Sequence, residues 1–336
     1  MGKRVLFLFL VGLVMVSISA KDIDLYEEID LDGIDTILIK PQNVHGVIVG
    51  FNFFSLDTFV TSIKSDQMQV ELKGGVFTTS SKNIPHIRFS QQRKKLIIYT
   101  DMKRKLSLLS CRMGSLNLNV RIPETFEGKV EIDSNVNDVE VFDFKGSELF
   151  INNSAGTTKV KNVDARKFTV DSKAGEVFLE NMVSELANVN LSAGNVVCEN
   201  IKFGISDIKN STGNIKIEDF ETANSHISNA GGNIKLYDII GKLSLNCSMG
   251  SMRIQVRELI DDLTVTGSSG SVKVELPDDS GFDYCFESSL GSIRCDFPRI
   301  QHINGASEKR QIGKVYDGGP LVKVTTSCGS IKILQY

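Results

Sequence analysis

The sequence contains no tryptophan, only six prolines and four histidines, and aromatic side chains make up 7% of its 336 residues. None of the histidines has a partner at the spacing of a catalytic triad or a metal site, which disfavours both kinds of site. Basic and acidic residues nearly balance, with a formal charge of −3, so the overall charge does not point to nucleic acid. Proline is absent between Pro123 and Pro277, as expected where backbone donors take part in β-ladders.

Long apolar runs are also scarce, and the one that is present lies at the start of the chain. Two basic residues come first, residues 5–16 are apolar, and small residues precede Lys21. This order predicts a secretory signal peptide over residues 1–20, most favourably cleaved after Ser19, with an uncleaved anchor as the alternative. We therefore expect an exported protein that is periplasmic, at the cell surface or secreted.

Glycine is plentiful and recurs at a nearly fixed step. Five glycines are each 19 residues apart, and the later ones continue at steps of 18, 20, 21 and 38 residues. They are Gly156, Gly175, Gly194, Gly213, Gly232, Gly250, Gly270, Gly291 and Gly329. A period near 20 residues predicts a solenoid, in which every repeat forms one coil stacked on the last.

Within each repeat, apolar residues alternate with polar ones on both sides of the glycine. Around Gly213, for example, Ile208, Ile215 and Ile217 hold the apolar positions. Alternation with period two indicates β-strands, so each coil has at least two. Six residues after the glycine stands an Asn or Asp, which tolerates the left-handed backbone of a corner. The residues at this second corner are Asp143, Asn162, Asn181, Asn200, Asp219 and Asp238.

These patterns predict an all-β protein, a right-handed parallel β-helix with coils of about 19–21 residues. A β-propeller is disfavoured because its repeats are about 40 residues long. An antiparallel sandwich is disfavoured because it would not place the same residue types at the same offsets in six coils. The expected organisation is a signal peptide (1–20), an N-terminal β region that covers the first coil (21–122) and the repeat β-solenoid (123–336).

Most of the six cysteines fit the interior better than a disulfide framework. Cys198 and Cys295 stand at inward positions, and Cys247 lies three residues before its glycine. These three lie in different coils, so they cannot pair with one another. Cys285 is expected to point outward, and a bond from it to Cys295 would need a local irregularity. We expect Cys198, Cys247 and Cys295 to be buried thiols, and we expect no metal site and no cofactor.

One row of basic residues is the most specific surface feature. Three residues after successive glycines the chain places Lys216, Lys235, Arg253, Lys273 and Arg294, with Lys332 in the last coil. Such a column is either a salt-bridged face that hinders aggregation or a groove for a linear polyanion, such as an acidic glycan or lipid head groups. An envelope protein is another possible partner. Phe178 and Val197 fill the same row in earlier coils and form a candidate apolar patch.

Acidic residues form a second row, two positions further on. Its members are Glu180, Glu199, Glu218, Glu275 and Asp296. Such a regular row is typical of solvated strands, whereas a catalytic carboxylate pair needs two unequal environments. We therefore expect no catalysis. The alternatives are a glycan-active β-helix enzyme and an envelope-stress sensor domain.

A family resemblance rests on three parts of the sequence besides the coils from Gly156 onward. These are Leu-Asn-Leu-Asn-Val-Arg-Ile-Pro at 116–123, Val-Glu-Leu-Pro at 274–277 and the closing segment 325–333. Over residues 35–336 the chain resembles the bacterial putative-adhesin family of β-strand-repeat proteins, a domain of unknown function. The resemblance implies an exported parallel β-helix at the cell envelope and no specific activity. The leading hypothesis is therefore a non-catalytic β-solenoid that acts as an adhesin-like or envelope-organising scaffold.

Overall fold

The computed structural model describes residues 19–41, 44, 46–50, 67–78, 85–102, 111–298, 300–302 and 307–336. Within these residues the chain forms 24 strands and no helix. Accordingly, no helix of the described part is long and apolar enough to cross a membrane. The expected signal peptide lies outside the described residues, except that Ser19 and Ala20 begin the first strand.

The strands fall into an irregular start, a regular middle and an irregular end. The start contains β1 (Ser19–Ile29), β2 (Thr36–Lys40), β3 (Gly46–Gly50), β4 (Met68–Thr78), β5 (Pro85–Gln92), β6 (Lys95–Met102), β7 (Cys111–Arg121), β8 (Lys129–Val136) and β9 (Asp138–Phe142). The middle contains β10 (Lys145–Ala155), β11 (Thr158–Ala174), β12 (Val177–Ala193), β13 (Val196–Thr212), β14 (Ile215–Gly231), β15 (Ile234–Met249) and β16 (Met252–Glu258). The end contains β17 (Leu263–Ser269), β18 (Val272–Leu276), β19 (Phe282–Ser288), β20 (Ile293–Cys295), β21 (Ile300–His302), β22 (Arg310–Val315), β23 (Leu321–Cys328) and β24 (Ile331–Gln335).

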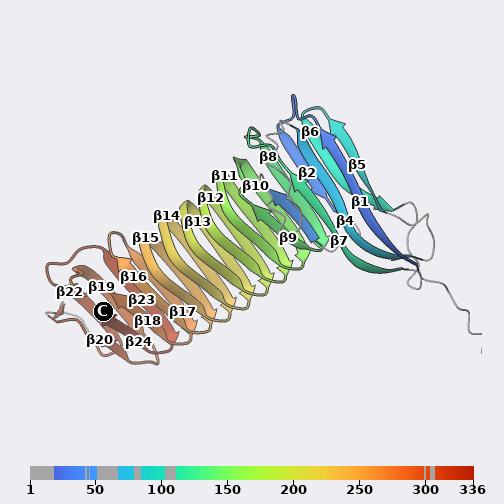
Figure 1. Cartoon of the computed structure of the whole chain (residues 1–336). Coiled ribbons are helices and arrows are strands. Elements are labelled where there is room, and N and C mark those ends of the chain that lie inside the picture. Colours follow the sequence, from blue (N-terminus) through green and yellow to red (C-terminus); the bar gives the residue numbers. More distant parts are fainter. Residues whose placement is uncertain are drawn as a thin grey trace, which may run out of the picture.

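The coils stack into one rod, as Figure 1 shows. Strands β11 to β15 each run through nearly a whole coil and pair in parallel with the next. Ile215, for example, pairs with Val196 on one side and Ile234 on the other, one repeat away in each direction. The predicted parallel β-solenoid is therefore confirmed.

Two corners of each coil have the left-handed backbone that the sequence predicted. The Asn and Asp corner residues from Asp143 to Asp238 have φ between 50° and 57°, and Gly156 to Gly232 have φ between 116° and 136°. The asparagines also bond along the stack, since Asn200 Nδ2 donates to Asn181 Oδ1 at 2.7 Å. Glycine is required at its corner because a Cβ on Gly213 would stand 1.8 Å from the carbonyl oxygen of Gly194.

The interior is filled by ladders of aliphatic side chains. Ile215 and Ile234 are fully buried, whereas their neighbours Lys216 and Lys235 are exposed, as the alternation predicted. Burial of one such isoleucine stabilises the fold by about 1.5–3 kcal/mol. Phe203 and Phe220 add an edge-to-face contact in the same core, with ring centroids 6.1 Å apart.

A column of small and amide side chains lines the core behind the glycine corner. Asn210 Nδ2 donates to the carbonyl oxygen of Gly194 at 2.9 Å, and Asn229 Nδ2 donates to that of Gly213 at 2.8 Å. Buried polar groups need such partners. In the next coil the Cys247 thiol lies 3.4 Å from the oxygen of Gly232, so this cysteine takes over the position of the amide.

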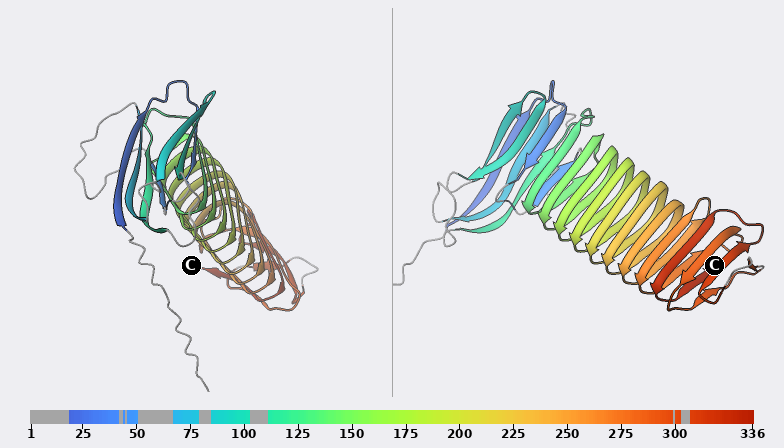
Figure 2. Two further views of the ribbon diagram at one scale, coloured as in Figure 1. Left: turned by 90° about the vertical axis from the view of Figure 1, so that its right-hand side faces the viewer. Right: turned by 180° about the vertical axis from the view of Figure 1, so that it is seen from behind.

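At the N-terminal end, the order of coils in the stack differs from their order in the chain. Strands β2 and β3 each lie between two parallel partners, β6 and β8 for β2, and β7 and β9 for β3. Strands β1 and β4, which pair antiparallel, extend the sheet beyond β7, and β5 extends it beyond β6 (Figure 2). Strands β2 and β3 therefore belong to the same stack as the repeats. The domain boundary near Pro123 stays a prediction.

The C-terminal end repeats this arrangement. The last coil of the chain, β23 and β24, lies between β17–β18 on one side and β19–β20 on the other. Strands β22 and β21 then cover the outer side of β19 in an antiparallel arrangement. The coil of β2 and β3 and the coil of β23 and β24 thus each lie between two other layers of strands rather than at the ends of the rod.

Candidate functional site

The basic residues singled out by the repeat do form one row across adjacent strands. Register pairs connect Lys216 to Lys235, Lys235 to Arg253, and Arg253 to Lys273. Parallel strands lie about 4.8 Å apart, so the row follows the long axis of the rod. We call this row the basic column, and it consists of Lys216, Lys235, Arg253, Lys273, Lys332 and Arg294 in that spatial order.

The position of Lys332 corrects the order expected from the sequence. Lys332 pairs in register with Lys273 on one side and with Arg294 on the other. Lys273 and Arg294 are therefore not neighbours, and Lys332 closes the gap between them. Spacing along the chain could not show this, because the last coil enters the stack before the coil that precedes it in the sequence.

Carboxylates neutralise four members of the basic column. Lys216 Nζ lies 2.9 Å from Glu218, and Arg294 Nε lies 2.6 Å from Asp296. Glu275 holds two cations, with Arg253 Nε at 2.9 Å and Lys273 Nζ at 2.7 Å. The face is therefore partly salt-bridged, which is the arrangement that the first of the two interpretations predicted.

The ion pairs alter the protonation equilibria of this face. Burial raises the pKa of Glu275, but hydrogen bonds from Lys273 and Arg253 outweigh that effect and hold it below its usual value. The pKa of Lys216 is raised by its hydrogen bond to Glu218, and that of Arg294 by its bond to Asp296. Glu275, Lys216 and Arg294 are therefore charged at neutral pH.

Lys235 and Lys332 differ from the other members. Their neighbours two residues on are Tyr237 and Leu334, and among the described residues neither lysine has a carboxylate within ion-pair distance. Both are exposed. Six cations thus face three carboxylates, and the surplus positive charge is concentrated on these two lysines.

Polar side chains at the glycine corner border the basic column. Asn195 Oδ1 accepts from the backbone N–H of Asn214 at 3.0 Å, and Asn214 Oδ1 accepts in the same way from Asn233. Ser292 donates to Ser330 at 3.2 Å further along. This edge therefore presents amides and hydroxyls, which hydrogen-bond sugars well.

The two residues of the candidate apolar patch lie next to each other in the expected row. Phe178 pairs in register with Val197, which in turn pairs with Lys216. Both side chains are half-buried. On the other side of Phe178 stands Lys159, whose amine lies 3.2 Å from Glu140. The row therefore changes from apolar to basic at Lys216.

The acidic row is continuous only over its first three members, since Glu275 lies in register between Gln255 and Leu334. Glu180, Glu199 and Glu218 are direct register neighbours on three strands. His226 lies half-buried on a different face, in register with Asp207 and Ser244. No group of three or more His, Cys, Asp or Glu side chains in the described part of the chain is arranged to hold a metal ion.

The cysteines that the structure describes are free thiols. Cys198 is buried in the inward ladder, where desolvation raises its pKa to about 12. Cys285 and Cys295 are half-buried, so the inward position expected for Cys295 is only partly closed by the end of the solenoid. Cys111 is not among the side chains described.

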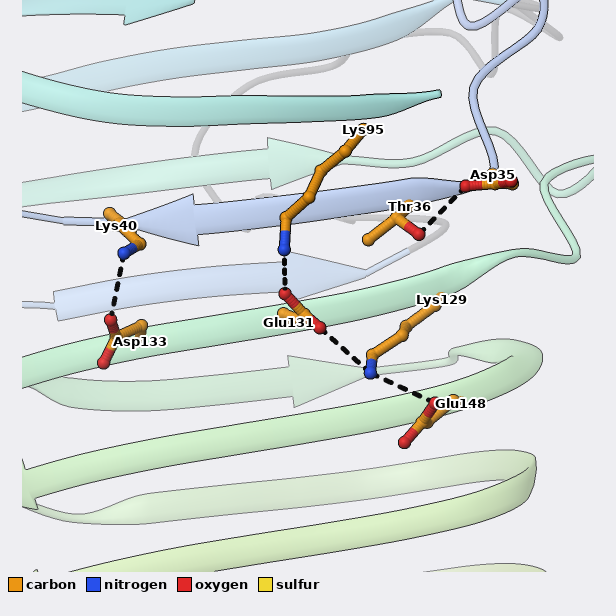
Figure 3. A network of polar contacts seen from close by, with 8 residues as sticks. All are labelled: Asp35, Thr36, Lys40, Lys95, Lys129, Glu131, Asp133 and Glu148. Atoms are coloured by element: carbon orange, nitrogen blue, oxygen red, sulfur yellow. Dashed lines mark hydrogen bonds and ion pairs between the residues drawn. The ribbon is translucent and has the colours of Figure 1, made fainter. Parts of the chain in front are cut away.

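A separate ion-pair network crosses the junction between the irregular start and the regular coils (Figure 3). Lys95 Nζ reaches across β2 to Glu131 at 2.5 Å, and Lys129 bridges Glu131 at 2.9 Å and Glu148 at 3.2 Å. Lys167 lies 3.0 Å from the other oxygen of Glu148. Burial raises the pKa values of both glutamates. The hydrogen bonds from the lysines lower them by more than that, so both pKa values lie below their usual range. This network connects strands β6, β8, β10 and β11.

The stacked coils define the class of β-solenoid repeat proteins, and sequence comparison identifies the family. The profile of the Toastrack DUF4097 family matches residues 51–219 and 188–334. The chain therefore belongs to the Toastrack DUF4097 family. No curated protein matches the sequence.

Three of the solved structures that match the chain are as follows. A protein described as a putative adhesin from Parabacteroides distasonis ATCC 8503 has a TM-score of 0.46 and 10% identity, over 95% of this chain and 97% of its own. One from Bacteroides fragilis NCTC 9343, described likewise, has a TM-score of 0.33 and 12% identity, over 93% and 97%. A protein described as a putative cell adhesion protein from Clostridium sporogenes ATCC 15579 has a TM-score of 0.25 and 12% identity, over 94% and 100%.

Proposed function

We propose that this chain is a non-catalytic exported scaffold that binds a linear acidic glycan along the basic column, in an adhesin-like or envelope-organising role. One observation carries the proposal: six cations stand on six adjacent strands, and the neighbouring row supplies only three carboxylates. Export is supported by the order of basic, apolar and small residues at the start of the sequence.

The geometry favours a polymer over a small anion. The basic column repeats at about 4.8 Å per strand, and its members are exposed except for the half-buried Lys273. An extended glycan that carries an acidic group at regular intervals can contact several cations at once, so weak exposed interactions add up. The asparagine and serine edge beside the column supplies hydrogen-bond partners for the glycan hydroxyls.

The ion pairs within the face do not oppose this binding. Exposed salt bridges contribute about 0–1 kcal/mol each, so Lys216, Arg253 and Arg294 can exchange or share their partners with a ligand at little cost. Lys235 and Lys332 need no exchange at all. We therefore expect these two lysines to contribute most to glycan affinity.

The test measures binding of polygalacturonate, with neutral dextran as the control polymer, at several salt concentrations. Polygalacturonate should bind, and its affinity should fall steeply as salt rises, because exposed charges are screened over about 8–10 Å at physiological strength. The triple variant K235Q/R253Q/K273Q should lose this binding. The triple variant R166Q/K173Q/K323Q removes the same number of exposed lysine and arginine charges elsewhere on the rod, and it should keep the binding.

Two outcomes would contradict the proposal. One is equal loss of affinity in both triple variants, which would reduce the effect to overall charge. The other is unchanged affinity in the column variant. Binding to vesicles with anionic head groups but not to polygalacturonate would assign the same cations to a lipid surface instead.

A further inference from the structure

A shallow groove runs along a different edge of the rod, at the corner after the Asn and Asp residues. Gly204 and Ala223 occupy this corner in successive coils, so little side-chain bulk fills it. The groove has a volume of about 390 Å³, and the buried ring of Phe203 forms part of its floor. It lies on another face than the basic column, whose strands precede the Asn and Asp corner.

The walls of the groove carry most of the large apolar side chains that are exposed in the regular coils. Val183 lines the groove on one side and is 48% exposed. Leu186 and Ile205 directly follow the lining residues Glu185 and Gly204 and are 44% and 56% exposed, and we call their row the second wall. Leu186 and Ile205 are register neighbours, so they form one continuous strip. An exposed apolar strip of this kind indicates a contact surface.

The side chains of the first wall form a row that is complementary to the same row in the reverse direction. Across four adjacent strands it presents Val183, Lys202, Glu221 and Ile240 in register. The order is apolar, basic, acidic, apolar. If a second copy lies antiparallel on this wall, each charge meets the opposite charge and each apolar end meets the other apolar end.

We propose that this groove and its walls bind a second copy of the same chain, with the two rods antiparallel about a two-fold axis between the coils of Lys202 and Glu221. Lys202 then faces Glu221 of the second copy, and Val183 faces Ile240 of the second copy. A two-fold contact uses the same patch on both partners, so every such pair occurs twice.

The second wall fits the same arrangement. Leu186, Ile205, Asn224 and Lys242 are register neighbours in this order. The two-fold axis places exposed Lys242 opposite Leu186 of the second copy and beside Glu185 of the second copy. The aliphatic part of the lysine then covers the leucine while its amine meets the carboxylate.

Within one chain, the central charges are only loosely held. Lys202 Nζ lies 3.0 Å from Glu221, and the two side chains are 69% and 45% exposed. Arg257 also approaches Glu221, at 4.0 Å. Both charges remain accessible to a second copy, because both side chains line the groove and are exposed.

The test compares self-association of the wild type and of two charge variants by analytical ultracentrifugation over a range of protein concentrations. The wild type should form dimers. The variants K202E and E221K each place like charges opposite one another, so each should associate at least tenfold more weakly. An equimolar mixture of K202E and E221K should form mixed dimers again, because each variant then meets the opposite charge in its partner.

Further variants separate association from folding and from glycan binding. I205D should also abolish dimers, while its thermal unfolding stays that of an ordinary surface variant, because Ile205 is exposed. The column variant K235Q/R253Q/K273Q should dimerise like the wild type. A monomeric wild type at all concentrations, dimers of undiminished strength in K202E and E221K, or no mixed dimers would each overturn the proposal.

Discussion

Gly329 lies directly on Gly270 in the stack, because a Cβ on Gly329 would stand 2.0 Å from the carbonyl oxygen of Gly270. On its other side lies Gly291, where a Cβ would stand 1.8 Å from the carbonyl oxygen of Gly329. The glycine corner is therefore continuous across a break in chain order. The last coil of the chain therefore lies within the stack, between two coils that precede it in the sequence.

Backbone amides in the last coil should exchange as slowly as those in interior coils. Val272 N–H donates to the oxygen of Ser330, and Ile331 N–H donates to that of Ser292, both at 2.9 Å. Chain ends usually fray and exchange fast. Hydrogen exchange with mass spectrometry should find β24 as protected as β18, and rapid exchange of β24 alone would contradict the stack order.

Two adjacent glycines should respond in opposite ways to alanine. Gly232 has φ of 125°, and a Cβ there would stand 2.0 Å from the oxygen of Gly213. G232A should therefore lower the free energy of unfolding by about 2 kcal/mol or more. At Gly231 the nearest atom to such a Cβ is 3.6 Å away, so G231A should be neutral or stabilising by up to about 1 kcal/mol. Urea denaturation of both variants provides the comparison, and equal losses would count against the corner geometry.

The inward ladder should not tolerate a charge. Ile234 is fully buried between Ile215 and Met252. I234D would place an unpaired carboxylate in the core, at a cost of roughly several kcal/mol, and should unfold the array. I234V removes one methylene and should cost only about 0.5–1.5 kcal/mol. Thermal melting monitored by circular dichroism checks both, and an unchanged melting temperature for I234D would refute the register.

The junction network should make stability depend on pH at the acid side. Burial raises the pKa of Glu148, but bonds from Lys167 and Lys129 lower it further, so its folded value is below the unfolded one of about 4.3. A lowered folded pKa stabilises the protein above the unfolded pKa, and that stability is lost as pH falls through the folded pKa. E148Q should therefore cost on the order of 1 kcal/mol at neutral pH and progressively less as the pH falls through the folded pKa of Glu148.

The same network has an alkaline limit. Burial lowers the pKa of Lys129, but hydrogen bonds to Glu131 and Glu148 raise it by more, so the folded pKa lies above the unfolded one of about 10.4. The stability that Lys129 contributes is therefore fully present below the unfolded pKa and is lost as pH rises through the folded pKa. E258Q, at an exposed carboxylate of β16, is the control for E148Q and should leave the pH profile unchanged. Identical profiles for the two variants would contradict a role for the network.

The regular coils could be predicted from the sequence because the same physical demand recurs at every repeat. Gly213 and Asn200 indicate corners, since few other residues accept their backbone angles. Ile215 and Ile217 indicate a strand whose alternate side chains point inward. The basic column followed from the same spacing. These features depend on neighbours in the chain, or on neighbours one repeat away.

The ends of the rod could not be predicted in this way. Lys332 joins Lys273 and Arg294 only because of a long-range exchange of coil order, and no local pattern encodes which coil a strand will stack on. The groove at Gly204 was also missed. Its signal was present, since Leu186 and Ile205 stand at outward positions, but alternation alone does not separate one outward face from another.

The enclosed last coil limits how such proteins can change in length. A duplication of one 19-residue unit in the middle of the chain adds a layer that matches its neighbours on both sides, since coils 143–238 are interchangeable in their corners. A unit appended after β24 finds no vacant place, because β18 and β20 already occupy both of its edges. Gains and losses of repeats among relatives should therefore fall between β9 and β16. The two ends, in which the order of strands in the stack differs from their order in the chain, should keep the same number of strands.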